Sequence, residues 1–138
     1  MNMNTVWGNQ VSGQALSIRT EQAAFRAGEP ILLNLTLKNF GQNPVVAVVR
    51  SPWLDYDIQV REASGSTVPH TEFAAQMKET AQEGRRAQQS LPGGATLEDA
   101  IDLAQVCALK PGKYSVTASR LVNAAGAVTS NTLTFEVK

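Results

Sequence analysis

Hydrophobic and polar residues alternate along several short segments of this chain, which is the pattern of half-buried β-strands. The clearest case is residues 31–39, where Ile31, Leu33, Leu35 and Leu37 share one face. Turn-forming residues separate such segments at intervals of roughly 8–12 residues, as in all-β sandwiches and barrels. The predicted strands are residues 14–20, 31–39, 45–50, 56–62, 86–91, 96–103, 113–122 and 132–137.

A Pro-Gly turn leads into the alternating strand that opens with Tyr114. A tyrosine just after a tight glycine turn is typical of a tyrosine corner, whose ring packs in the core of a β-sandwich while its hydroxyl bonds upstream backbone. We therefore predict a structural corner formed by Leu109, Gly112 and Tyr114. The fold predicted from these patterns is an all-β, immunoglobulin-like antiparallel sandwich of seven or eight strands.

Residues 71–86 interrupt the β-pattern. They are rich in Glu, Gln, Ala, Lys and Arg, and Phe73, Met77 and Ala81 recur at helical spacing. This spacing predicts a short surface helix inserted into the sandwich. The polar, glycine-containing residues 1–13 predict a flexible N-terminal arm, and residues 14–138 form the predicted sandwich domain.

Several segments between Phe25 and Lys138 resemble the immunoglobulin-like and fibronectin type III-like domains of bacterial proteins. These segments are Gly28-Glu29-Pro30 with residues 31–39, the hairpin of residues 55–69, Leu91-Pro92-Gly93-Gly94, Ile101-Asp102-Leu103, residues 109–114 and residues 130–135. Val116 stands where antibody domains carry their second core cysteine, so an apolar core replaces the disulfide. The resemblance implies a non-catalytic binding or structural module of a secreted or envelope protein, contacting protein or carbohydrate through loops or a sheet edge.

A weaker resemblance connects residues 35–39 and 56–68 to the bacterial intracellular proteinase inhibitor family. It implies an alternative function, in which residues 51–55 or the insertion 71–91 enter a protease cleft. No motif locates a reactive loop, so no inhibitory residue carries over.

Length and charge narrow the class of protein. With 138 residues, 43% of them hydrophobic, the chain fits one domain with a substantial core. Twelve basic and twelve acidic residues give no net charge, which argues against nucleic-acid binding. The apolar runs are too short for membrane insertion. The first residues show no signal-peptide pattern, so we expect a secreted, periplasmic or envelope protein whose targeting segment has been removed, or alternatively a cytoplasmic one.

Catalysis and cofactor binding have little support in the sequence, and we expect neither. His70 is the only histidine, and no nucleophile motif surrounds nearby Ser64 and Ser66. One histidine and one cysteine are too few for a structural zinc site. Cys107 lies in an apolar run, which predicts a buried, unreactive thiol that forms no internal disulfide.

Two acidic groups are candidates for weak calcium binding. Asp55 and Asp57 share a face if both lie on one strand, and Glu98, Asp99 and Asp102 form the second group. Neither group has the glycine-spaced loop of a dedicated calcium site, and charged residues also protect sheet edges. Solvated edge charges are therefore the favoured interpretation.

The predicted loop of residues 51–55 holds the candidate partner contacts Pro52, Trp53 and Asp55. Trp53 either anchors a partner or caps the core, and the usual burial of large aromatic residues favours capping. We interpret Arg85 and Arg86 as part of a solvated loop. The sequence does not identify the partner, and a homodimer through an exposed strand edge stays open.

Overall fold

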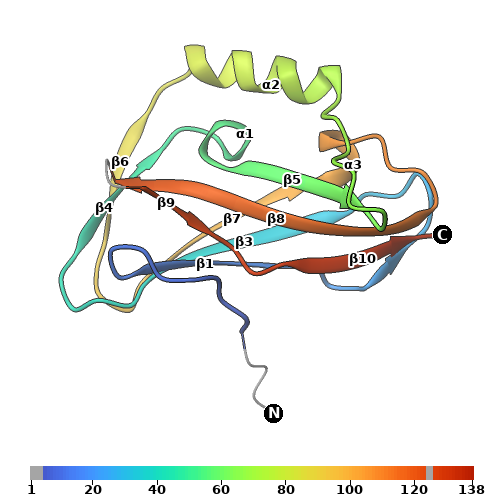
Figure 1. Ribbon diagram of the computed structural model, residues 1–138. Helices are drawn as coiled ribbons and strands as arrows, with labels where there is room; N and C mark the ends of the chain where they lie inside the picture. Colours follow the sequence, from blue (N-terminus) through green and yellow to red (C-terminus); the bar gives the residue numbers. More distant parts are fainter. Residues whose placement is uncertain (1–4, 124–125) are drawn as a thin grey trace.

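The computed structural model describes residues 5–123 and 126–138 and is built mainly from β-strands (Figure 1). The strands are β1 (Gln14–Arg19), β2 (Ala24–Phe25), β3 (Leu32–Asn39), β4 (Val45–Val49), β5 (Asp57–Glu62), β6 (Ala87–Leu91), β7 (Thr96–Asp102), β8 (Gly112–Asn123), β9 (Gly126–Thr129) and β10 (Leu133–Val137). The helices are α1 (Pro52–Asp55), α2 (Glu72–Glu83) and α3 (Leu103–Val106).

Two sheets pack face to face, and a two-stranded ribbon extends from them (Figure 1). The first sheet has the order β1-β3-β7, and the second has the order β2-β10-β8-β5, with β9 also paired to β8. Strands β4 and β6 form the separate ribbon. Pairing is antiparallel except between β2 and β10. The predicted immunoglobulin-like sandwich with a helical insertion is confirmed.

The hydrophobic alternation places the core between the two sheets. Leu33, Leu35 and Leu37 of β3 are buried, as are Val116 and Ala118 of β8. Burying a side chain of leucine or valine size contributes roughly 1.5–3 kcal/mol, so these alternating positions hold the layers together. The sequence pattern did not predict β2 and β9, because β2 has only two residues and β9 consists of Gly-Ala-Val-Thr.

Tyr114 has the geometry of a tyrosine corner. Its hydroxyl donates a hydrogen bond to the Lys110 carbonyl oxygen at 2.6 Å. Its ring stacks on Phe135 with 5.5 Å between the centroids. The acceptor is Lys110 rather than the neighbouring Leu109, and Gly112 begins β8. The corner therefore ties the turn before β8 to the second sheet.

The helical insertion forms α2, which lies outside the sandwich above α1 and β5 in Figure 1. Thr71 caps it, because its hydroxyl accepts a hydrogen bond from the Ala74 backbone N–H at 3.1 Å. Ala74 is buried, while Phe73 is partly exposed and meets the edge of Trp53 at 5.8 Å between centroids. The helix thus covers α1 with a small apolar face.

The described part of the N-terminal arm lies against the sandwich. The Val6 carbonyl accepts a hydrogen bond from the Ser17 hydroxyl at 2.6 Å, and the Gly8 N–H donates to the Leu16 carbonyl at 3.0 Å. Trp7 meets Phe40 edge to face at 5.1 Å between centroids. Residues 5–13 of the predicted arm therefore contact the sandwich, and residues 1–4 lie outside the described part.

Candidate ligand pocket between β4 and β8

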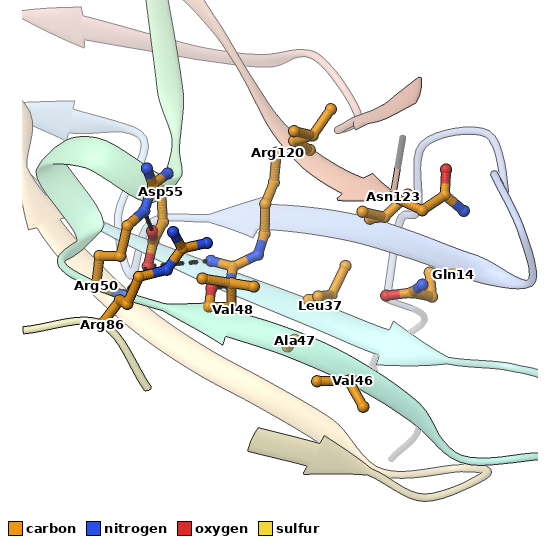
Figure 2. A pocket seen from close by; sticks show the side chains of 12 residues that line it. Gln14, Leu37, Val46, Ala47, Val48, Arg50, Asp55, Arg86, Arg120 and Asn123 are labelled. Atoms are coloured by element: carbon orange, nitrogen blue, oxygen red, sulfur yellow. Dashed lines mark hydrogen bonds and ion pairs between the residues drawn. The ribbon is translucent and has the colours of Figure 1, made fainter. Parts of the chain in front are cut away.

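A pocket of about 290 Å³ opens between the β4–β6 ribbon and the end of β8. Figure 2 shows the guanidinium groups of Arg50, Arg86 and Arg120 at the end where Asp55 lies. Gln14 and Asn123 lie at the opposite end. Apolar side chains of β3, β4 and β8 also line the pocket: Leu37, Val46, Ala47, Val48, Leu121 and Val122.

Arg120 is the buried cation of this pocket. Its side chain is only 4% exposed, because residue 120 has the same inward parity in β8 as Tyr114, Val116 and Ala118. Nη2 donates to the Val48 carbonyl oxygen at 2.6 Å. Nη1 has no hydrogen-bond acceptor within the described part of the chain, where its nearest opposite charge is an Asp55 oxygen at 3.6 Å.

Asp55 is the buried anion, although the sequence placed it in an exposed loop. Ser51 and Pro52 start the one-turn helix α1 at this point, and the helix turns Asp55 inward. Its Oδ1 accepts from Arg50 Nε and its Oδ2 from the Arg50 backbone N–H, each at 2.9 Å. The Asp55 side chain is only 3% exposed, and its role as a partner contact stays a prediction.

Tyr56 and Asp99 extend the network of polar contacts around Arg120. The Arg120 guanidinium lies 4.9 Å from the centroid of the Tyr56 ring. The Tyr56 hydroxyl donates to Asp99 Oδ2 at 3.2 Å. Burial raises the pKa of Asp99, although the Tyr56 hydrogen bond and the Arg120 charge act in the opposite direction. Burial also raises the pKa of Tyr56 above its ordinary range, so the phenol stays protonated.

The opposite end of the pocket contains the Gln14 amide. Gln14 is only 4% exposed as a residue, and its side chain makes no hydrogen bond among residues 5–123 and 126–138. Its amide atoms are not among the buried unpaired polar atoms, so they reach the solvent in the pocket. Asn123 beside it donates to the Ser12 hydroxyl at 2.7 Å. Val46 and Leu121, which also line the pocket, are 58% and 70% exposed. The pocket therefore combines an amide at this end with an exposed apolar border.

Of the candidate partner contacts from the sequence, Asp55 lines the pocket, and Trp53 and Pro52 lie outside its lining. Trp53 is half-buried, packs on the core and contacts Phe73, as expected of a core cap. Pro52 occupies the first turn of α1. Both segments expected to enter a protease cleft contain helix, since α1 lies within residues 51–55 and α2 within residues 71–91.

Among the residues that the structure describes, no three or more His, Cys, Asp or Glu side chains group together as they would to hold a metal ion. Asp55 points inward and Asp57 is exposed, so the shared face predicted for them is wrong. Asp102 instead caps α3, and its Oδ1 accepts from the N–H groups of Ala104 and Ile31, both at 2.9 Å.

His70 and Cys107 lie side by side in an isolated β-bridge below α2. His70 is half-buried, and its Nε2 lies 2.7 Å from the Ile58 carbonyl oxygen and its Nδ1 3.4 Å from Lys78 Nζ. Cys107 is buried as predicted, and burial raises the pKa of its thiol to about 11. Both residues therefore belong to the packing under the helix.

Apart from Asp55, sequence reasoning missed the residues that build the pocket, although two of them carried a signal. Gln14 has the same inward parity in β1 as Leu16 and Ile18, and Arg120 continues the inward series of β8. Polar residues at inward strand positions indicate either the end of a core or a polar site. Nothing in the sequence indicated that Arg50 and Arg86 are neighbours, because only the pairing of β4 with β6 brings them together.

No protein-family profile and no curated protein matches the chain. Among solved structures, the C-terminal domain of Wzt superposes with a TM-score of 0.55 and 14% identity, covering 96% of this chain and 76% of that chain. A β-glucosidase from Listeria innocua in complex with isofagomine gives a TM-score of 0.49 and 14% identity, covering 90% of this chain and 16% of that chain.

The CARDB domain of the PF1109 protein from Pyrococcus furiosus, in complex with di-metal ions, gives a TM-score of 0.46 and 11% identity. It covers all of this chain, 100%, and 95% of that one. At such identities the likeness concerns the fold alone. The resemblances to fibronectin type III-like domains and to proteinase inhibitors stay predictions. Among the described residues, no helix is long and apolar enough to cross a membrane. The chain has an immunoglobulin-like β-sandwich fold.

Proposed function

We propose that this protein is a non-catalytic binding module, part of a secreted or envelope protein, whose ligand enters the pocket between β4 and β8. The observation that carries the proposal is Arg120 Nη1, a buried nitrogen in the pocket lining that has no hydrogen-bond partner among the described residues. Buried polar groups in folded proteins are nearly always paired, because an unpaired one costs about 1–3 kcal/mol. A bound ligand supplies the missing partner.

The apolar border of the pocket supports the same function. Leu121 and Val46 are large apolar side chains that remain exposed at a concave site. Apolar surface around a few oriented polar groups is the usual composition of a ligand pocket. At about 290 Å³ the pocket suits a small molecule or the end of a larger protein or carbohydrate ligand.

The polar groups of the pocket favour binding over catalysis. Asp55 is the only carboxylate in the lining, and both of its oxygens already accept hydrogen bonds from Arg50. Such a carboxylate is poorly placed to accept a proton from a ligand. The other polar groups are arginine side chains and amides, which orient ligands and do not transfer protons near pH 7.

The test uses hexan-1-ol as a small amphipathic probe, titrated into ¹⁵N-labelled protein. We expect the backbone amides of Val46, Val48 and Leu121 and the side-chain amide of Gln14 to shift together. The Leu121→Ser variant should bind the probe more weakly, whereas Leu32→Ser, which truncates another exposed leucine outside the pocket, should bind like the wild type. Shifts confined to other surfaces would refute the proposed site.

A further inference from the structure

We infer that the ligand of this pocket carries an anionic group, a carboxylate or a phosphate, which Arg86 binds at the cationic end beside Arg120. The inference rests on the proposed function and adds the chemistry of the ligand. Three guanidinium groups and one carboxylate line the pocket, so its lining has an excess of positive charge. The whole chain, in contrast, has no net charge.

Asp55 does not neutralise this excess. Arg50 occupies both Asp55 oxygens through its Nε and backbone N–H at 2.9 Å. Arg120 lies 3.6 Å from the same carboxylate, too far for a hydrogen bond, and its Nη1 has no acceptor in the described chain. The buried Asp55 carboxylate is therefore shared by the charges of Arg50 and Arg120, and Arg86 adds a third positive charge.

Arg86 is the group that an incoming anion can reach. It is exposed, and its side chain has no hydrogen-bond or ion-pair partner among the residues that the structure describes. Figure 2 shows its guanidinium turned toward those of Arg50 and Arg120 around Asp55, not away from the pocket. Like charges gathered in this way repel one another, and an anion among them relieves the repulsion. Guanidinium groups bind carboxylates and phosphates through paired, charge-assisted hydrogen bonds.

The anionic group adjoins an apolar part of the ligand. Val46 and Ala47 line the pocket between its cationic end and the Gln14 amide, and Leu121 is also part of the lining. An apolar surface of this kind favours a hydrocarbon segment next to the anion, because burial removes both surfaces from water. A bare inorganic anion leaves that surface uncovered. The ligand class is therefore a small amphipathic carboxylate or phosphate, or a chain that ends in one.

The test compares hexanoate, hexyl phosphate and hexan-1-ol, which share one alkyl chain and differ in the head group. Each probe is titrated into ¹⁵N-labelled protein while the amides around the pocket are followed. We expect at least one anion to bind roughly tenfold more tightly than the alcohol, as one charge-assisted hydrogen-bonded contact supplies. A preference between the two anions identifies a carboxylate or a phosphate ligand.

The matched variants are Arg86→Gln and Arg85→Gln, which remove one charge from adjacent exposed residues, of which only Arg86 lines the pocket. We expect Arg86→Gln to remove the advantage of the anion over the alcohol and Arg85→Gln to keep it. Equal binding of all three probes, or equal effects of the two variants, would overturn the anionic ligand and leave the pocket as a binding site. Failure of every probe to shift the pocket amides would overturn the proposed function as well.

Discussion

Asp55 and Arg120 form an ion pair inside the protein, with Asp55 Oδ2 lying 3.6 Å from Arg120 Nη1 and both side chains less than 5% exposed. Asp55 comes from the one-turn helix α1, and Arg120 comes from the middle of β8. The pair therefore fixes α1 against the second sheet and sets the base of the pocket. Both Asp55 oxygens accept hydrogen bonds from Arg50, whereas Arg120 Nη1 has no hydrogen-bond acceptor among the described residues.

Removing the carboxylate of this pair should destabilise the protein strongly. The Asp55→Ala variant leaves Arg50 and Arg120 without their anion, and breaking a buried pair in this way costs roughly 3–5 kcal/mol. Urea unfolding followed by circular dichroism measures the change. Asp57→Ala is the control, because Asp57 is exposed, and its effect should stay within about 0.5 kcal/mol. Equal losses in the two variants would contradict the structural role of Asp55.

Replacing Gln14 with leucine should leave the free energy of unfolding unchanged or raise it by about 1 kcal/mol, because the amide has no partner to lose within the described chain. Asn39→Leu is the matched control. Asn39 is equally buried, and its side chain bonds the Asn43 carbonyl at 2.8 Å, the Leu91 carbonyl at 3.0 Å and the Gly41 N–H at 2.9 Å.

The Asn39→Leu variant should lose more than about 2 kcal/mol in the same urea titration, since several backbone groups are left unpaired. A residue whose polarity costs stability without an internal partner is typical of a binding site. If Gln14→Leu loses as much as Asn39→Leu, the Gln14 amide has a structural role and is not a ligand-binding group of the pocket.

The tyrosine corner should contribute about 1 kcal/mol through a single hydrogen bond. Tyr114→Phe keeps the ring that stacks on Phe135 and removes the hydroxyl that donates to the Lys110 carbonyl. Tyr114→Leu also removes the stacked ring and should cost more. Thermal unfolding of both variants measures the two steps. A fully stable Tyr114→Phe protein would show that the turn before β8 is held without this bond.

The buried thiol of Cys107 should make stability fall at alkaline pH. The folded protein keeps the thiol protonated up to a pKa of about 11, whereas the unfolded chain releases the proton near pH 9.0. The unfolded state thus binds fewer protons in this window, so the free energy of unfolding decreases as the pH rises through it. Urea titrations at pH 8, 9, 10 and 11 measure the slope, which Cys107→Ala should reduce.

Reactivity of the thiol gives an independent check on the same burial. Cys107 should react with an aromatic disulfide reagent much more slowly in the native protein than in urea, because the thiolate is both inaccessible and disfavoured. Rapid labelling of the native protein at pH 8 would mean that the region under α2 opens readily.

The sequence predicted the fold better than the site because the two depend on different information. Alternation in β3 and β8 and the turn before Tyr114 are local patterns, and each identified its element correctly. Helix α2 was also locally encoded, by the spacing of Phe73, Met77 and Ala81. The short helix α1 was read as a loop, because one turn is too short to show a period.

The pocket required long-range information. Gln14 and Arg120 occupy inward strand positions that the alternation did mark, but nothing local says that both face the same cavity. Arg50 and Arg86 are brought together by the antiparallel pairing of β4 with β6 across the helical insertion. Asp55 reads as a surface residue until α1 turns it toward Arg120.

A crystal structure of the protein with hexyl phosphate tests the central claim most directly. The account predicts that the phosphate lies within about 3.2 Å of the Arg86 guanidinium, at the end of the pocket that holds Arg120. The alkyl chain should run past Val46 and Leu121 toward Gln14. Hexyl phosphate bound at another surface, with the pocket unchanged, would contradict the assignment of this pocket as the ligand site.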